Sequence, residues 1–442
     1  MQERKQNPLL KIWEYLQRES QWFRPGLGYK RWLMLVFFGT TLLGVGLALF
    51  LLDVYRTAPE TWWLPALAYL SLRFLNRPIR VIVFASIGVI LVLIGIWGSN
   101  RSLLKPFVPP GKHIIEALDS YRRRDRGPRV VVLGGGHGLA SLLRGLKAFT
   151  HNITAIVTVA DDGGSSGELR KNIGILPPGD IRNCLAALSN NEDLLSQLFQ
   201  YRFAAGAGLE GHSLGNLFIT ALTEITGSFE EAVAESGRVM AVYGRVLPST
   251  LTDVRLLADL ENGDGRIKHV SGETQIRDTD GSIRRLWLDP ANTPAFPPAI
   301  SSVLGADLII IGPGSLYTSL LPNLLVRDLA DAVRASQAMK FFICNVATER
   351  GETDGFNCLD HVHSVEKHVG QGLFDLVICN NHFEGELGRD VAWVKMDANL
   401  LRHSAVYCAD LIDSNYPWRH DSVRLAKTVM DLFFERTGPL RD

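Results

Sequence analysis

A glycine-rich turn after a short apolar run constrains the fold of this 442-residue chain more than any other feature. Residues 129–134 (RVVVLG) are rich in valine, four glycines fall within residues 134–138, and the following LASLLRGLKAF repeats its apolar residues with a helical period. A strand, a glycine turn and a helix in this order are typical of parallel α/β sheets. Glycines in such a turn also let a phosphate approach the N–H groups at the start of the helix.

Five later runs are apolar on both faces, as expected of strands inside a parallel sheet. They span residues 153–160, 307–312, 341–346, 374–380 and 404–410, and most segments between them have helical patterns. We therefore predict an α/β domain over residues 129–436 with a Rossmann-like, doubly wound and mainly parallel sheet. Residues 245–290 break the pattern with GDG and DTDG turns between alternating runs, which predicts a small β-rich insertion.

Five polar loops lie beside these predicted elements, at residues 134–138, 161–170, 176–183, 211–216 and 312–319. Open α/β sheets bind ligands at the carboxyl ends of their strands, so we expect the loops to converge on one anion-binding crevice. The first loop lacks the last glycine of the dinucleotide fingerprint, because Leu139 stands there, and no P-loop motif occurs. The predicted ligand-binding residues are Gly134, Gly135, Gly136, His137, Gly138, Asp161, Asp162, Ser165, Ser166, Gly179, Asp180, Asn183, His212, Asn216, Gly312, Gly314, Ser315, Asn345 and Arg419.

Several acidic and hydroxyl residues of these loops have two interpretations. Asp161 and Asp162 can bind Mg²⁺ or a ribose hydroxyl, or they can lie in a solvated turn. Asp180 and Ser315 can contact a ligand or cap a helix. No catalytic residue can be assigned from these patterns.

Arg419 and a histidine cluster are also open to two interpretations. The Arg419 guanidinium can hold a phosphate or pair with Asp421 at the surface. His361 and His363 suggest a metal site, but residues two apart on a helix point in different directions. Hydrogen bonding that positions the loop at residues 351–357 is the simpler account.

The five cysteines all lie after residue 183, without paired Cys-x-x-Cys spacing, and several fall in apolar runs. This predicts free thiols in a reducing compartment, with neither a disulfide framework nor a zinc site. Cys184 is a minor candidate for a reactive thiol.

Charge is divided unevenly along the chain. Residues 1–129 carry 19 Lys and Arg against 8 Asp and Glu, whereas the rest carries 27 against 38. An acidic body without a basic stripe would repel a phosphate backbone, so no nucleic-acid partner is expected.

Two uncharged runs near the N-terminus, residues 32–52 and 81–100, match the roughly 20 residues that cross a bilayer as a helix. They predict a transmembrane hairpin over residues 32–100, between a basic N-terminus (1–31) and a basic linker (101–128). Residues 61–72 are too short to span and suggest an interfacial or re-entrant segment.

The arrangement of positive charge predicts the orientation of this hairpin. Seven Lys and Arg precede the first run, four lie between the runs and eight follow in residues 101–129. The positive-inside tendency then gives a multi-pass cell-membrane protein whose termini and main domain are cytoplasmic. Residues 121–126 (YRRRDR) can contact lipid headgroups or form a solvated linker.

Taken together, these stretches resemble the gluconeogenesis factor family, which is related to 2-phospho-L-lactate transferase. The resembling stretches include VVVLGGGHGLASLLRGLK, VTVADDGGSSGELR, LPPGDIRNCLAAL, GHSLGNL, LIIIGPGSLYTSLLPNLLV, DHV and RHD, in order from Arg129 to Met430. The resemblance implies a Rossmann-like body that binds UDP-sugars and links carbon supply to cell-wall growth and cell shape. His137 stands where the family commonly has threonine, and the 128-residue N-terminal part has no counterpart in its usual members.

The resemblance leaves two functions open. The first is a membrane-tethered nucleotide-sugar sensor that acts through protein partners, as a homo-oligomer. The second is a transferase, since the related transferases use aspartates and a divalent metal ion. That pattern implies Asp162 and Asp180 as Mg²⁺ ligands.

Overall fold

The computed structural model describes residues 74–104, 124–190 and 194–438, and eleven residues within 34–48 together with residues 69 and 72. The chain divides into two units, Met1–Arg122 and Arg123–Arg441. The predicted basic N-terminus, most of residues 61–72 and most of the basic linker lie outside the described residues.

The N-terminal unit contains helix α4 (Arg77–Leu104), which includes the second predicted membrane span. Part of the first predicted span lies outside the described residues. Among the residues that are described, no helix has both the length and the apolar character needed to cross a bilayer. This contradicts the transmembrane hairpin and the multi-pass membrane localisation. The prediction rested on the length and uncharged character of two sequence runs, which do not by themselves establish a spanning helix.

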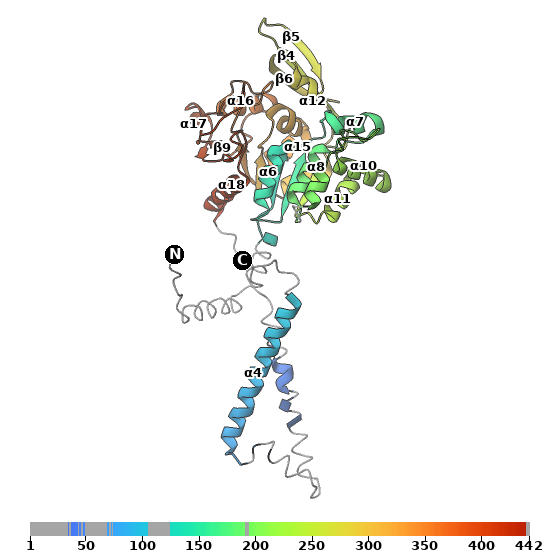
Figure 1. Cartoon of the computed structure of the whole chain (residues 1–442). Coiled ribbons are helices and arrows are strands. Elements are labelled where there is room, and N and C mark those ends of the chain that lie inside the picture. The colour runs from blue at the N-terminus through green and yellow to red at the C-terminus, as the bar shows by residue number, and fades with distance from the viewer. Residues whose placement is uncertain are drawn as a thin grey trace, which may run out of the picture. The chain divides into compact units, whose positions relative to one another are not determined.

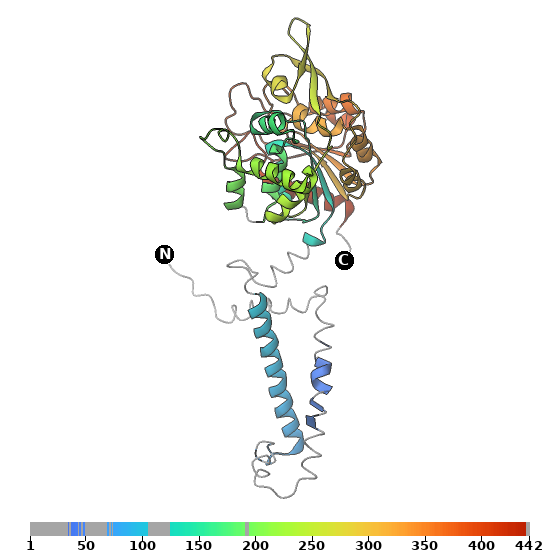
Figure 2. The ribbon, with the colours of Figure 1, turned by 90° about the vertical axis from the view of Figure 1, so that its right-hand side faces the viewer.

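The second unit is built on a seven-stranded sheet (Figures 1 and 2). In spatial order its strands are β10 (Val406–Ala409), β9 (Leu376–Asn380), β8 (Met339–Ile343), β7 (Leu308–Ile311), β1 (Val130–Gly134), β2 (Ile153–Val157) and β3 (Arg245–Pro248). Every neighbouring pair is parallel. The prediction of an α/β fold with a mainly parallel sheet is therefore confirmed.

The strand order reverses direction between β1 and β7. From β1 the chain proceeds to β2 and β3 on one side, and from β7 to β8, β9 and β10 on the other. Neighbouring strands of this kind send their connections to opposite faces, which leaves a crevice beyond their carboxyl ends. Both predicted glycine turns, after Gly134 and after Ile311, lie at this switch point.

Helices cover the sheet on both faces. Helix α6 (Gly136–Leu146) packs between α8 (Gly179–Leu188) and α18 (Ser422–Thr437), and α13 (Pro297–Leu304) packs on α15 (Arg327–Ala335). The remaining helices are α7 (Gly164–Ile173), α9 (Leu194–Gln200), α10 (Leu214–Thr226), α11 (Phe229–Val239), the π-helix η3 (Leu316–Leu320), α14 (Leu321–Leu324), α16 (Cys358–Val369) and α17 (Leu400–His403). Strands β1, β2 and β9 are buried along their whole length, so they form the centre of the core.

A second, smaller sheet projects from this body, as Figure 1 shows. Strand β4 (Arg255–Glu261) pairs antiparallel with both β5 (Ile267–Ser271) and β6 (Ser282–Asp289), and the short helix α12 (Glu273–Asp278) follows β5. The smaller sheet thus covers residues 255–289, whereas residues 245–248 form the edge strand β3 of the main sheet.

Candidate functional site

A cavity of about 660 Å³ that is lined by several charged residues lies at the switch point of the main sheet. Its walls come from the turns after β1 and β7, the start of α8, helix α12, the loop after β8 and residues 418–420. Eleven of the predicted ligand-binding residues line it: Gly135, Gly136, His137, Gly138, Asp161, Asp180, Asn183, Gly314, Ser315, Asn345 and Arg419. Five polar loops far apart in sequence were predicted to converge, and residues from four of them do.

The turns after β1 and β7 touch each other, which requires glycine at the contact. A Cβ on Gly138 would stand 2.9 Å from the Cα and N atoms of Gly314. Gly314 itself has a φ of 150° and Gly136 a φ of 64°. Because backbone meets backbone here, neither side has a flexible side chain that could give way.

Helix α6 begins inside the cavity without a side-chain cap. Its N-cap residue is Gly135, which has no side chain to cap the first turn. One N–H group of this turn, that of Gly136, donates to the Asp180 carboxylate. The N–H groups of His137 and Gly138 lack an intrahelical acceptor, as at every helix start, and the helix dipole favours an anion beside them.

Three carboxyl groups line the cavity, and one of them, Asp180, lies against the turn after β1. Burial, and then the neighbouring charge of Asp161, raises the pKa of Asp180 to about 7. Burial also raises the pKa of Asp161 and, with the charges of Asp161 and Asp180 added, raises that of Glu273 well above its ordinary value. Glu273 comes from α12, so the smaller sheet contributes an acid to the cavity. Groups of this kind are stabilised by a cation, which removes their mutual repulsion.

Positive charge enters the cavity from three arginines, Arg277, Arg350 and Arg419, all largely exposed. The pKa of His137 is lowered, mainly by burial and then by the charge of Arg419, so this ring is neutral at pH 7. The guanidinium of Arg419 lies over the Tyr416 ring at 5.5 Å. Among the ion pairs of the described residues, none joins Arg419 to Asp421, whose carboxylate instead caps α18 through Val423 and Arg424 at 2.8 Å each.

The turn after β7 is closed by a carboxylate of the protein itself. Glu352 Oε2 accepts from the N–H groups of Tyr317 (3.1 Å) and Thr318 (3.3 Å), and its Oε1 accepts from Thr318 Oγ1 at 2.7 Å. Burial, and then the charge of Glu349, raises the pKa of Glu352 to about 7. The start of η3 therefore binds a carboxyl group of the protein itself. In the turn after β1, Asp180 accepts from Gly136 N–H, and the N–H groups of His137 and Gly138 remain as the candidate anion donors. Ser315 precedes η3, and its side chain makes no capping hydrogen bond.

Asn345 links this turn to the loop after β8. Its Oδ1 accepts from Gly314 N–H at 3.3 Å, while its Nδ2 donates to Gly314 O at 3.0 Å and to Glu349 Oε1 at 3.1 Å. Burial raises the pKa of Glu349. Asn345 thus sets the position of the glycine turn and uses most of its own hydrogen-bonding capacity to do so.

The other predicted residues lie outside the cavity lining. These are Gly134, Asp162, Ser165, Ser166, Gly179, His212, Asn216 and Gly312. Asp162 turns away to the smaller sheet, where its Oδ1 accepts from Thr274 N–H (3.0 Å) and Thr274 Oγ1 (2.9 Å).

Ser165, His212 and Asn216 form a buried hydrogen-bond network. The hydroxyl of Ser165, in α7, lies 3.0 Å from His212 Nδ1, and Nδ2 of Asn216, in α10, donates to it at 3.0 Å. Together they join α7 to α10, so their polar groups support the site rather than line it.

His361 and His363 of α16 lie in different environments, as their spacing predicted. His361 is buried, and its Nδ1 lies 2.8 Å from Asn357 O at the end of the loop at residues 351–357. His363 is exposed and contacts the His403 ring.

Several lining residues were not predicted. They are Glu273, Arg277, Ser319, Glu349, Arg350, Trp418 and His420, with Ser141 and small apolar residues beside them. Glu349 and Arg350 follow β8 at the carboxyl edge of the sheet, and this position was the signal available in the sequence. Glu273 and Arg277 carried no such signal, because they belong to the smaller sheet's helix.

The fold and this site define an α/β protein with a charged cavity at the switch point of a doubly wound sheet. A model of the family described as 2-phospho-L-lactate transferase CofD matches residues 130–411, more than half of the chain. The chain therefore belongs to the CofD family. It is also homologous to the gluconeogenesis factors. The resemblance seen in the sequence is confirmed.

Individual relatives cover the same region. The gluconeogenesis factor of Bacillus subtilis is 46% identical over 323 residues, 70% of this chain and 99% of its own. A relative from Nostoc sp. is 48% identical over 378 residues, 82% of this chain and 80% of its own. The crystal structure of a UPF0052 family member from Bacillus halodurans is 42% identical with a TM-score of 0.63, covering 69% of this chain and 99% of that one.

Proposed function

We propose that the cavity binds a nucleotide sugar of the UDP-sugar class and that the chain acts as a regulator linking carbon metabolism to cell-wall growth and cell shape. The observation that carries this proposal is the uncapped start of α6, which opens into a cavity of about 660 Å³ beside arginines and carboxyl groups. The volume is within the usual range for a small-molecule ligand.

The diphosphate would lie at the turn after β1. The N–H groups of His137 and Gly138 can donate hydrogen bonds to a phosphate at this turn. The neutral His137 ring can donate or accept a further hydrogen bond. Arg419, which also lines the cavity, can add a bidentate contact to a phosphate.

A divalent cation fits the acidic wall. Asp161 and Asp180 are oxygen donors whose pKa values are raised mainly by burial. Mg²⁺ commonly binds through one or two carboxylates together with the phosphates of its substrate. Asp161 and Asp180 would hold it, and it would then neutralise charge between the acids and the diphosphate.

Ligand binding agrees with the make-up of the cavity. It offers backbone donors, Asn183 and Asn345 amides and arginines, which are groups that recognise a ligand. A regulator of this type passes its state to protein partners, and a homo-oligomer would present several such sites.

Equilibrium dialysis of the full chain with UDP-N-acetylglucosamine and Mg²⁺ tests the proposal. We expect one saturable site, weakened at least tenfold by Arg419→Ala and unchanged by Arg402→Ala, an exposed arginine of α17 outside the cavity. Absence of saturable binding to the wild-type chain, or equal binding by both variants, would contradict it.

The raised pKa of Asp180, about 7, favours a second candidate function. A carboxyl group that titrates near neutral pH is suited to proton transfer, and with Mg²⁺ on Asp161 the cavity could carry out phosphoryl-type or nucleotidyl-type transfer. Release of a nucleoside monophosphate from a panel of donors, lost in Asp180→Asn but kept in Asp162→Asn, would support this transferase function. No release from any donor with Mg²⁺ present would exclude it in favour of the regulator.

A further inference from the structure

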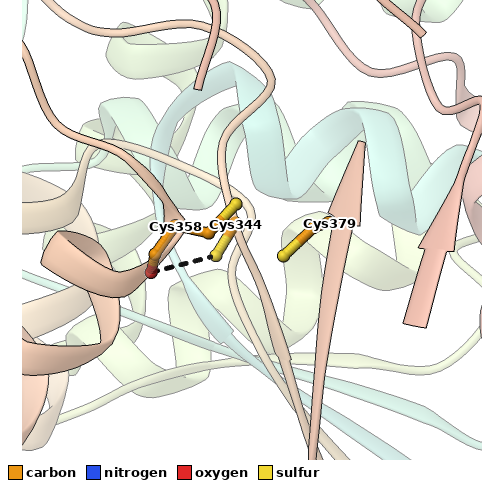
Figure 3. Close-up of side chains that lie close together, drawn as sticks. All are labelled: Cys344, Cys358 and Cys379. Atoms are coloured by element: carbon orange, nitrogen blue, oxygen red, sulfur yellow. Dashed lines mark hydrogen bonds between the residues drawn. The ribbon is translucent and has the colours of Figure 1, made fainter. Parts of the chain in front are cut away.

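Three cysteines lie close together near the carboxyl ends of β8 and β9, and none of them lines the cavity. Cys344 follows β8, Cys358 is the first residue of α16 and Cys379 lies in β9. Their sulfur atoms all lie within 4.8 Å of one another (Figure 3). All three residues are fully buried, at 0% exposure.

This spacing is close to that of a thiolate metal site. A tetrahedral Zn²⁺ lies about 2.3 Å from each sulfur, which places the sulfurs about 3.8 Å apart. Side-chain rotations alone can therefore bring the three sulfurs to one ion. The sequence hid this group because its members are separated by 13 and 20 residues and no Cys-x-x-Cys pair marks them.

The local contacts favour thiolate at this place. Cys358 begins a 12-residue helix whose capping box of Asn357 and Asp360 fixes its first turn. The positive end of the helix dipole favours a thiolate there. The Cys344 thiol, in contrast, donates a long hydrogen bond of 3.9 Å to Cys358 O (Figure 3).

A buried imidazole supplies an independent indication. His361 lies three residues after Cys358, on the same face of α16, and is 1% exposed. Its Nδ1 bonds to Asn357 O at 2.8 Å, which leaves Nε2 as the unprotonated nitrogen. Nε2 is buried and has no hydrogen-bond partner. Metal-binding histidines are oriented in this way, with one nitrogen donating to a backbone carbonyl and the other free for the ion.

We propose that Cys344, Cys358 and Cys379 are the thiolate ligands of a buried site for a thiophilic divalent metal ion of the Zn²⁺ class, with His361 Nε2 as the nitrogen ligand. Nε2 is not part of the tight sulfur group, so the proposal requires the His361 ring to shift toward the sulfurs when an ion binds. Binding releases three thiol protons, and the ion leaves a net charge of −1 on the four ligands. Packing of three free thiols as small apolar side chains is the competing account, and it leaves the orphaned His361 nitrogen unexplained.

A metal ion here would connect the end of β8, the start of α16 and β9. Asn345, next to Cys344, holds the glycine turn after β7, and Asn380, next to Cys379, accepts from Leu411 N–H at 3.2 Å. The site would thus stabilise the loops at this edge of the sheet.

Cobalt substitution of the full chain tests the proposal. The protein is purified under reducing conditions, stripped with a chelator and titrated with Co²⁺, then with Zn²⁺. We expect one equivalent of Co²⁺ with thiolate-to-cobalt charge-transfer absorption and intense tetrahedral d–d bands, both removed by one equivalent of Zn²⁺. Elemental analysis should find one zinc per chain.

Variants separate the site from its surroundings. Cys344→Ser, Cys358→Ser and Cys379→Ser should each weaken Zn²⁺ binding at least tenfold, and His361→Ala should remove the tetrahedral d–d intensity. Cys184→Ser, at a buried cysteine of α8 outside the group, is the matched control and should bind like the wild type. Circular dichroism checks that each variant folds. A serine variant that does not fold is replaced by the alanine variant at the same position.

Two results would overturn the proposal. The first is that the reduced, folded wild-type chain binds neither ion stoichiometrically, or that all three cysteine variants bind the ions as well as the wild type does. The other is an intact mass lower by two hydrogens after mild oxidation, together with no metal binding, which would identify the group as a disulfide pair.

Discussion

The backbone of Gly135 lies directly against the carboxylate of Asp180, so that a Cβ on Gly135 would collide with Oδ2. The neighbouring Gly136 N–H donates to the same carboxylate. The glycine turn after β1 and the first turn of α8 are therefore one unit, in which the acid takes the space that a side chain would otherwise fill. The state of charge of Asp180 acts directly on the N–H groups available to a ligand.

Gly138→Ala should destabilise the fold and reduce ligand binding. The added Cβ would meet the backbone of Gly314 at 2.9 Å, and overpacking of this kind costs about 1–3 kcal/mol. The higher helix propensity of alanine offsets at most about 1 kcal/mol. Urea denaturation measures the change, with Gly263→Ala as control because no atom lies within 4 Å of its Cβ position. Equal stability of the two variants would show that the turns can separate.

Asp180 should make the metal-free protein less stable as the pH rises. Its pKa is about 7 in the folded chain, mainly through burial, against about 3.9 in the unfolded chain. A raised carboxyl pKa contributes stability that is full below pH 4 and is lost as the pH rises through 7. The free energy of unfolding of the wild type minus that of Asp180→Asn should therefore fall by about 2–4 kcal/mol between pH 4 and pH 8.

Mg²⁺ provides the check on this interpretation. A cation bound by ionised carboxylates should stabilise the wild type more at pH 8 than at pH 5.5, because below pH 7 Asp180 is mostly protonated. Thermal unfolding with and without Mg²⁺ measures the effect. A difference between wild type and Asp180→Asn that does not change with pH would contradict the burial of this carboxyl group.

Asp162→Asn should loosen the smaller sheet without changing the cavity charge. The carboxylate accepts two hydrogen bonds from Thr274, at 3.0 and 2.9 Å, which tie the loop after β2 to α12. We expect faster amide hydrogen exchange in β4, β5 and β6, and a free energy of unfolding that is lower by about 1–2 kcal/mol. Thr274→Val combined with Asp162→Asn should cost less than the sum of the two single changes.

The sequence predicted the main sheet because its strands are buried on both faces and so read as continuous apolar runs. The runs at residues 129–134, 307–312 and 374–380 differ from β1, β7 and β9 by no more than two residues at either end. The glycine turns were found for the same local reason. Gly138 and Gly314 lie beside strand ends, where backbone approach requires glycine.

Long-range partners could not be predicted from local patterns. Asp161 and Asp162 are adjacent and equally acidic, yet only Asp161 lines the cavity, because Thr274 of the smaller sheet binds the other. Glu352 was passed over, although it occupies the turn after β7 that was expected to hold a phosphate. The localisation inferred from two uncharged runs near the N-terminus was likewise wrong, because no helix of the described residues meets the requirements for crossing a bilayer.

Glu352 provides the last test, because it separates an internal anion from a ligand site. Glu352→Ala would leave the N–H groups of Tyr317 and Thr318 buried without an acceptor, at a cost of about 2–4 kcal/mol. Glu352→Gln should cost much less, since its amide oxygen can accept both N–H groups and its NH₂ can donate to Thr318 Oγ1. Glu224→Ala, at an exposed glutamate of α10, is the control for the loss of a surface charge. If phosphate or a nucleotide restored the stability of Glu352→Ala but not that of Glu224→Ala, the start of η3 would be an anion site that Glu352 normally blocks. If Gln were as damaging as Ala, the negative charge rather than the hydrogen bonding of Glu352 would hold the turn after β7.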